Sequence, residues 1–242
     1  MLIMAGDWAG EHNRDLQATR ERLEARGLWR KQRVIVILPA GEMMAPIVSL
    51  ALWNLAFPVN NPKIYLLAQG MEVGAAYSES IADLMRNPDL SEWDYVLTVE
   101  HDNLPPNYGL LRLIELMEEH PEFSAIGGLY FSKGEGGVAH IWGDPSDPVP
   151  NFRPQLPDAD GGLVECCGLA MGFTLFRLSM FKDERLRQPW FASPEHADSP
   201  GTQDLYAWDD FRQYGYRCAV ACDVRVGHLD FTGQFGPKGK IW

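Results

Sequence analysis

The stretch WDYVLTVEHDN (residues 93–103) joins an apolar run to a group of polar residues. The apolar part has the β-branched and aromatic residues of a strand that is buried on both faces. Glu100 and Asp102 follow directly at the end of this strand. Open α/β sheets bind ligands at the carboxyl ends of their strands, so we expect a functional site here.

Two segments upstream have the same pattern of strand and loop. RVIVIL (33–38) predicts a strand that ends in a loop at Pro39, and KIYLLA (63–68) predicts a second strand that ends at Gln69. Apolar residues at helical spacing follow each of them, over residues 44–55 and 74–85. Three strands alternating with helices predict the first half of a Rossmann-like sheet.

The second half of the chain continues the α/β pattern around longer loops. We expect a helix from Leu110 that stops at Pro121, and extended loops over 134–162 and 192–201. The remaining elements are expected to be a strand at 124–131, a short strand at 138–142, a buried strand and turn at 164–176, a helix at 204–214 and a strand at 217–224.

The sequence therefore predicts one α/β domain, with a mostly parallel central sheet flanked by helices, over residues 33–230. Its two halves would be 33–103 and 104–230. The charge-rich stretch within residues 1–32 predicts an accessory helix that lies on this domain. The glycine-containing segment 231–242 is expected to be a flexible tail.

Composition restricts the classes of partner. The chain has 21 Lys+Arg against 33 Asp+Glu, a formal net charge of −12, which argues against a basic surface for nucleic acid or anionic lipid. A polyphosphate partner would need a divalent cation to offset the repulsion. The four cysteines form no CxxC pair, and we find neither a signal peptide nor an integral membrane segment, so a soluble, cytoplasmic protein is expected.

The acid-x-acid triplet is the sharpest chemical feature. Residues i and i+2 of a strand share a face, so we expect Glu100 and Asp102 to converge on a single hard cation, while His101 points away. Such triplets also occur by chance on solvated turns, especially in a chain with 33 acidic residues. From the residues alone both interpretations remain open.

Six segments in a fixed order carry a resemblance to a known family. They are RVIVILP, EHD, GGLYF, CCGLAMGFTLFRLSMF, TQDLYAWDDFRQYGYR and DVRVGHLD, all within residues 33–230. This order resembles the GT-A nucleotide-sugar-dependent glycosyltransferases, and most closely glycosyltransferase family 2. The resemblance implies a GT-A fold with a donor half (33–103) and an acceptor half (104–230). It also implies transfer of a sugar from a UDP- or GDP-linked donor to a hydroxyl of an unknown acceptor.

The resemblance also assigns a metal site. Glu100 and Asp102 match the family's DxD-like motif, which holds Mn²⁺ or Mg²⁺ on the donor diphosphate, and His228 matches the histidine that completes the metal shell. Glu100 differs from the commoner aspartate, and its longer side chain suits the metal, a bound water or the donor ribose. For His228 the alternative is a structural or solvent-facing histidine.

In the family a carboxylate at the start of a helix takes the proton from the acceptor hydroxyl, and Asp204 matches it, with Gln203 in place of the usual Glu. A direct displacement with Asp204 as base would invert the anomeric centre, although the same fold serves retaining enzymes. The alternative is that Asp204 only interacts with the helix dipole, with Thr202 as a cap.

The resemblance places further residues around donor and acceptor. The chain lacks the acidic residue after the second strand and the Arg-Asn pair that many members have, which leaves the base open between UDP, GDP and others. For the acceptor, the alternatives are a strand bend at the glycines and a core position for the tryptophan. The donor candidates are Pro39, Ala40, Glu42, Gln69, Tyr77 and Glu100, and the acceptor candidates are Gly168, Gly172 and Trp190. In this interpretation Tyr77 stacks on the donor base and Trp190 is a stacking platform for a sugar ring.

Two rival functions remain. A non-catalytic nucleotide- or carbohydrate-binding module could keep this fold, and Gln203 leaves that alternative open. A sugar nucleotidyltransferase fits less well, because its phosphate loop is long and basic and residues 39–42 are neither.

Overall fold

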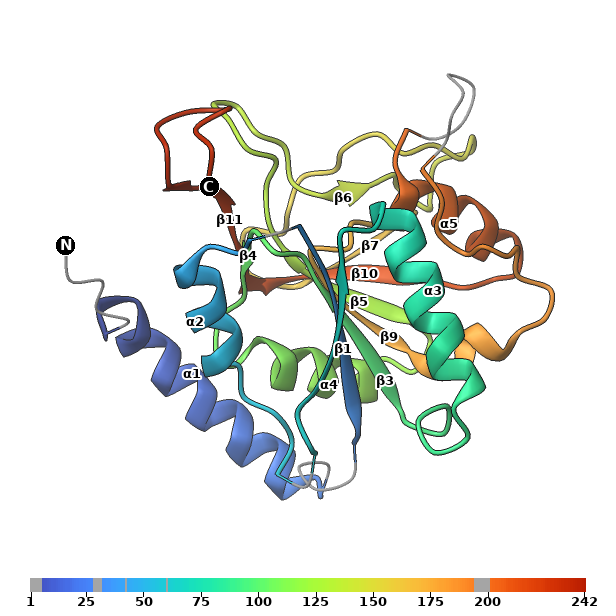
Figure 1. Ribbon diagram of the computed structural model, residues 1–242, viewed down its shortest axis with the longest axis horizontal. Coiled ribbons are helices and arrows are strands. Elements are labelled where there is room, and N and C mark those ends of the chain that lie inside the picture. The colour runs from blue at the N-terminus through green and yellow to red at the C-terminus, as the bar shows by residue number, and fades with distance from the viewer. Residues whose placement is uncertain (1–5, 28–31, 42, 60, 194–200) are drawn as a thin grey trace.

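A seven-stranded sheet forms the centre of the molecule (Figure 1). The computed structural model describes residues 6–27, 32–41, 43–59, 61–193 and 201–242, with side chains from residue 16 onward. The strand order is β2-β1-β3-β9-β5-β10-β7. The strands are β1 (Val34–Ala40), β2 (Ile64–Gln69), β3 (Tyr95–Val99), β5 (Ala125–Leu129), β7 (Leu163–Cys166), β9 (Phe173–Arg177) and β10 (Cys218–Arg225).

The sheet is largely parallel. β2, β1 and β3 run side by side in one direction, and β5 and β10 run in the same direction. β9 lies between β3 and β5 and is antiparallel to both, and β7 is antiparallel to β10 at the edge. The sequence predicted the three parallel strands β1 to β3, and the carboxyl ends of all five parallel strands meet at one edge of the sheet.

Helices cover both faces of the sheet (Figure 1). Alternate residues of β1 face opposite sides: Val34 and Val36 pack with α2 and α4, whereas Ile35 and Ile37 pack with α3 and α5. This two-sided burial explains the continuous apolar strands in the sequence. The helices are α1 (Gly6–Ala25), α2 (Pro46–Asn54), α3 (Val73–Arg86), α4 (Gly109–Glu119) and α5 (Gln203–Gln213), with a 3₁₀ helix η1 (Leu178–Lys182).

Two small sheets lie beyond the carboxyl ends of the parallel strands. One consists of β4 (Asn103–Leu104), β11 (Gly227–Asp230) and β12 (Lys240–Ile241), and the other of β6 (Ile141–Trp142) and β8 (Gly168–Leu169). β11 is antiparallel to β4 and pairs His228 with Asn103. This register brings the end of the chain back to the turn that follows β3.

The first strand is longer than expected. The sequence predicted a loop from Pro39, but β1 continues through Pro39 and Ala40, which pair with Ala68 and Gln69 of β2. Pairing with β3 stops at Ile37, so Pro39 has a neighbouring strand on one side only. A strand tolerates the missing N–H of proline at such a position.

The C-terminal segment over 231–242, for which we expected a flexible tail, forms a turn and a short strand in the structure. The buried carboxylate of Asp230 accepts hydrogen bonds from the backbone N–H groups of Gly233, Gln234 and Phe235 at 2.8–3.0 Å. β12 then pairs with β11, and Trp242 exchanges two backbone hydrogen bonds with His228. A carboxylate with three backbone donors holds a turn firmly.

The chain is thus a mixed α/β single domain with a Rossmann-like arrangement. Within the described ranges, no helix combines the length and the apolar character needed to cross a membrane. All four cysteines are buried and free.

Candidate active site

The turn after β3 separates the two carboxylates that the sequence placed on one face. β3 ends at Val99, and the N–H of Asn103 donates to the carbonyl of Glu100 at 3.1 Å, which closes a tight turn. The alternation of a strand therefore does not apply to residues 100–102. Glu100 and Asp102 consequently contact different partners.

Asp102 lies between two nitrogen groups. Its Oδ2 atom accepts a hydrogen bond from Nζ of Lys133 and lies 3.7 Å from Nε2 of His228. Burial raises the pKa of Asp102, but His228 and Lys133 outweigh it and hold the pKa well below its usual range. Asp102 is therefore ionised at neutral pH.

His228 is oriented by its second ring nitrogen. Nδ1 lies 2.8 Å from the carbonyl oxygen of Phe131. A carbonyl only accepts, so Nδ1 carries a proton, and Nε2 is the ring nitrogen that faces Asp102. This is the usual orientation of a metal-binding histidine, fixed by a backbone carbonyl behind it.

Glu100 points into the protein. Tyr77 donates its hydroxyl to Oε1 of Glu100 at 3.4 Å. Burial, followed by the charges of Asp102 and Asp204, raises the pKa of Glu100 to about 8. Two carboxyl groups of one turn thus have opposite preferences for the proton.

Asp204 reaches the same site from α5. It lies in the first turn of the helix, where its Oδ1 accepts hydrogen bonds from Thr202 Oγ1 and from the N–H of Leu205. Only 6% of the residue is exposed, and burial raises the pKa of Asp204. Asp204 is close enough to Glu100 to disfavour its ionisation. The helix therefore presents this carboxylate to the other acids and not to solvent.

The predicted three-residue metal site is not assembled as expected. Nowhere in the described ranges do three or more His, Cys, Asp or Glu side chains form a group suited to a metal ion. Asp102 and His228 come together, whereas Glu100 does not join them because the turn directs it to Tyr77. A carboxylate oxygen and an imidazole nitrogen 3.7 Å apart fit a shared cation, so these two residues suit a divalent metal and a further ligand would have to complete its shell.

The chain shares its fold with A197 from STIV. This solved structure has 13% sequence identity and a TM-score of 0.57, and the match covers 82% of this chain and 86% of A197. At this identity the likeness concerns the fold alone. No family model matches the sequence. No curated relative matches it either.

The site also contains residues that the sequence did not single out. Tyr130 is buried beside the carboxylates and accepts a hydrogen bond from the N–H of Gly172 at 2.9 Å. His140 stacks on Tyr130 with ring centroids 4.5 Å apart, and burial, followed by the charge of His228, lowers the pKa of His140 to about 4. A neutral His140 is therefore expected at physiological pH. Tyr130, Lys133 and His140 follow β5, whose carboxyl end meets the same edge as that of β3, and this topological rule was the available signal.

The two aromatic candidates, Tyr77 and Trp190, are buried in the core. Tyr77 is fully buried with its ring 5.7 Å from that of Phe191, an environment typical of a core residue. Trp190 is 4% exposed and packs edge-on against Phe181, which favours the alternative interpretation, a core position. Both rings belong to the core between the sheet and α3 and α5.

The two glycine candidates allow close packing within the protein. A Cβ on Gly172 would lie 2.6 Å from both Asn103 Oδ1 and Tyr130 Oη, and a Cβ on Gly168 would lie 3.0 Å from Leu205. These contacts favour the alternative interpretation, in which the glycines serve the strands and not a sugar.

The donor-side candidates lie at the predicted edge. Ala40 and Gln69 are paired at the ends of β1 and β2, with Pro39 one residue before. Gln69 is exposed there. Glu42 lies outside the described residues.

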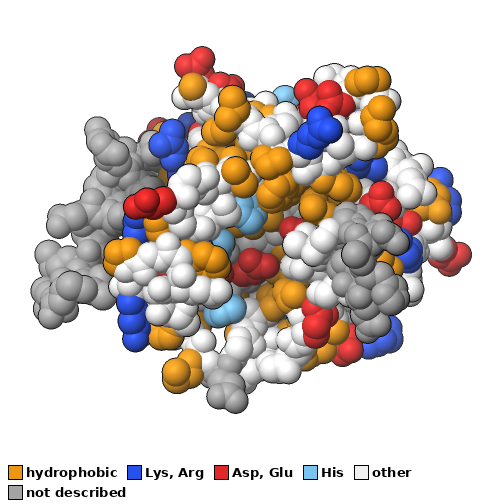
Figure 2. All heavy atoms as spheres, turned by 90° about the horizontal axis from the view of Figure 1, so that it is seen from above, with side chains coloured by type: hydrophobic (Ala, Val, Ile, Leu, Met, Phe, Trp, Pro, Cys, Tyr) orange, Lys and Arg blue, Asp and Glu red, His pale blue; other side chains and the backbone are white. Residues whose placement is uncertain are grey.

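Figure 2 shows the molecule from this side. A hollow opens on the face that is uppermost in Figure 1, with acidic side chains at its floor, histidines beside them and hydrophobic side chains around the rim. This distribution is typical of a ligand-binding pocket with polar groups at its base.

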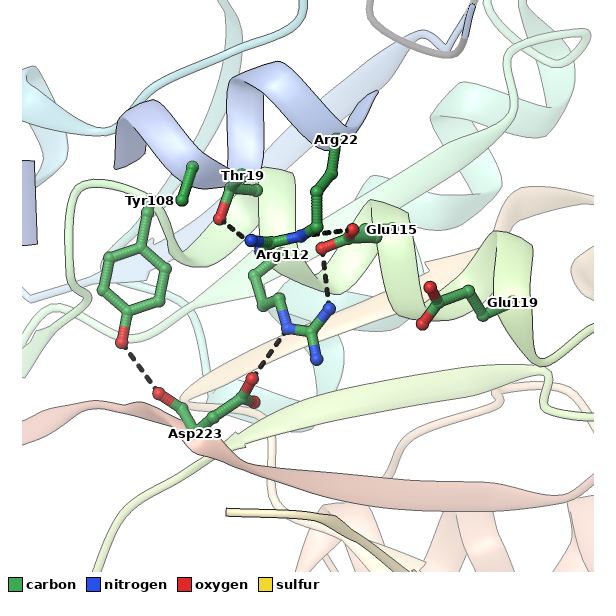
Figure 3. Close-up of a pocket in the computed structure, with 8 residues that line it drawn as sticks. Thr19, Arg22, Tyr108, Arg112, Glu115, Glu119 and Asp223 are labelled. Carbon is green, nitrogen blue, oxygen red and sulfur yellow. Dashed lines mark hydrogen bonds and ion pairs between the residues drawn. The ribbon is translucent and has the colours of Figure 1, made fainter. Parts of the chain in front are cut away.

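A second cavity, of about 470 Å³, shares no residue with this site (Figure 3). It lies between α1, α4 and β10, and all of its charged groups except Glu119 are paired with one another. Glu115 is buried between Arg22 and Arg112, and Arg112 also binds Asp223. The network attaches α1 to the domain, so we interpret this cavity as a structural junction.

Proposed function

We propose that this protein is a metal-dependent glycosyltransferase of GT-A type, similar to family 2, which moves a sugar from a nucleotide diphosphate to an acceptor hydroxyl. The observation that carries the proposal is the meeting of Asp102 and His228, 3.7 Å apart at the carboxyl edge of the sheet, beside Glu100 and Asp204, whose pKa values are raised while that of Asp102 is lowered. Carboxyl groups whose environments separate their pKa values are typical of acid–base sites.

Asp204 is the proposed general base. Burial raises its pKa toward neutrality, which makes it a stronger base than a solvated aspartate. Hydrogen bonds from Thr202 and Leu205 to Oδ1 hold the carboxylate in place. It would accept the proton of the acceptor hydroxyl while that oxygen attacks the sugar, and a direct attack would invert the anomeric centre.

Asp102 and His228 are the proposed protein ligands of Mn²⁺ or Mg²⁺, and the donor diphosphate would supply further oxygens. When bound, the cation would neutralise charge on the departing diphosphate. Asp102 is ionised for this role, and the Phe131 carbonyl keeps Nε2 of His228 directed at the same place.

Glu100 has a separate proposed role. Because its pKa is raised to about 8, it is largely protonated at neutral pH and can donate a hydrogen bond. We propose that Glu100 binds a hydroxyl of the donor, such as that of the ribose, and is not a metal ligand.

The test is release of nucleoside diphosphate from a panel of UDP- and GDP-sugars, with and without Mn²⁺, by the purified protein. We expect turnover of at least one donor that EDTA abolishes and that Asp102→Ala reduces by at least about 100-fold. Full metal-dependent turnover by Asp102→Ala would contradict the assignment. Nucleotide binding without turnover of any donor would instead support a non-catalytic binding module.

A further inference from the structure

Lys133 is a cation that the proposed mechanism does not use. It lies in a hairpin that follows β5, closed by hydrogen bonds from the N–H of Ser132 to the carbonyl of Val138 and from the N–H of Val138 to Oγ of Ser132, at 2.9 and 3.0 Å. Gly134 and Gly136 have positive φ values of 107° and 75°, which this tight connection requires. The hairpin holds the base of the Lys133 side chain beside the site.

The ammonium group of Lys133 is hydrogen-bonded to Oδ2 of Asp102, the oxygen that would bind the metal. It donates to Oδ2 of Asp102, the same atom that lies 3.7 Å from His228 Nε2. The side chains of Lys133 and Asp102 are only 16% and 20% exposed, so solvent screens this ion pair little. A divalent cation bound to the same oxygen would be repelled by the ammonium at close range.

The surrounding charges explain why a lysine is held there. The carboxyl groups of Glu100, Asp102 and Asp204 lie at the same end of the sheet, and the ammonium of Lys133 donates to one of them, Asp102. The ammonium therefore offsets repulsion among the acids when no ligand is present. Lysine has a flexible four-carbon stem and a compact charge, so it can exchange one anionic partner for another.

We propose that Lys133 is an exchangeable counter-ion, which holds Asp102 in the ligand-free protein and yields it to a divalent cation when a diphosphate arrives to accept the ammonium. The proposal rests on the proposed function, since it assumes that a diphosphate and a metal share this site. Its consequence is that metal and diphosphate bind with positive coupling, and that Lys133 suppresses binding of the metal alone.

The decisive experiment measures Mn²⁺ binding by electron paramagnetic resonance in the full-length protein without nucleotide. Lys133→Met keeps the length of the side chain and removes the charge, and we expect it to lower the Kd for Mn²⁺ about tenfold. Lys133→Arg keeps a cation and is expected to stay within about twofold of the wild type. Lys182→Met is the matched control, because Lys182 pairs with Glu92 on the surface and its loss changes the net charge equally.

A second titration adds inorganic pyrophosphate as the diphosphate probe. Pyrophosphate should lower the Kd for Mn²⁺ in the wild type by a larger factor than in Lys133→Met. The reason is that only the wild type has an ammonium group that can move from Asp102 to the pyrophosphate. Thermal unfolding of each variant verifies that it is folded, and Lys133→Gln replaces Lys133→Met if the latter does not fold.

Equal Mn²⁺ affinity in the wild type and in Lys133→Met would overturn the counter-ion proposal, as would failure of every variant to bind Mn²⁺ with pyrophosphate. If Mn²⁺ affinity is equal in the two proteins but the wild type transfers sugar, only the counter-ion proposal is wrong and the proposed function is supported. Absence of transfer together with tighter Mn²⁺ binding by Lys133→Met would overturn the proposed function and keep the exchange of cations at Asp102.

Discussion

Glu100 and Asp102 lie two residues apart in one turn, and their surroundings shift their carboxyl pKa values in opposite directions. Glu100 points into the protein beside Tyr77, whereas Asp102 contacts Lys133 and His228. Burial dominates in the first case and the nearby nitrogen groups dominate in the second. The turn after β3 thus places two similar side chains in different surroundings, which favour a neutral Glu100 and an ionised Asp102.

The first prediction concerns stability and pH. The raised pKa of Glu100 means that the folded protein retains a proton that the unfolded chain releases, between the ordinary glutamate pKa and about 8. The free energy of unfolding should therefore fall as pH rises through this window. Glu100→Gln removes the penalty, and we expect it to be more stable than the wild type by about 2–4 kcal/mol at pH 9, and by much less at pH 5.

Urea unfolding in the presence of EDTA measures this difference, because a bound cation would also relieve the repulsion. An equal effect of Glu100→Gln at pH 5 and pH 9 would show that Glu100 is not buried in its neutral form.

The second prediction separates chemistry from binding at Asp204. Asn in place of Asp204 keeps an acceptor for Thr202 and Leu205 but cannot take a proton. We expect donor binding within about twofold of the wild type and a loss of at least about 1000-fold in kcat for sugar transfer. Isothermal titration with the active donor and single-turnover assays give the two values. Loss of donor binding would recast Asp204 as a structural residue.

The third prediction tests the position of Trp190. Because this ring is 4% exposed and packs on Phe181, Trp190→Ala should lower the free energy of unfolding by about 3–5 kcal/mol. Trp53→Ala is the control, since Trp53 is 81% exposed and its loss should change stability by less than about 0.5 kcal/mol. Retained stability of Trp190→Ala with a raised KM for the acceptor would restore the interpretation as a sugar platform.

The fourth prediction concerns the attachment of α1. Glu115 is fully buried between Arg22 and Arg112, whose hydrogen bonds outweigh the effect of burial and lower the pKa of Glu115. The stabilisation is present above the ordinary glutamate pKa and is lost as pH falls through the lowered value. Glu115→Gln should cost about 2 kcal/mol at pH 7 and less near pH 3.

Urea unfolding of Glu115→Gln at pH 7 and near pH 3 measures this cost, with Glu119→Gln as a matched control. Glu119 of α4 pairs with Arg26, the residue that follows α1, at a more exposed position, and its loss should cost less than about 1 kcal/mol. Equal costs for both variants would mean that the junction does not depend on the buried glutamate.

Much of the fold follows from local patterns. The apolar runs around residues 34–38, 64–68 and 95–99 became the three parallel strands β1 to β3, and the helical spacing near Leu110 and Asp204 became α4 and α5. These predictions succeeded because strand and helix periodicity is a property of neighbouring residues. The same patterns did not reveal that β9 inserts antiparallel between β3 and β5, because strand order depends on contacts between distant segments.

The sequence by itself determined that an acidic α/β protein carries acids at the end of a buried strand, since residue type and order are enough to show that. Only the tertiary structure decided which residues meet. The turn after Val99 separated Glu100 from Asp102, the pairing of β11 with β4 brought His228 to Asp102, and the hairpin after β5 delivered Lys133. The physical reason is that a side chain's partners and its proton affinity depend on burial and on charges from segments far away in the chain.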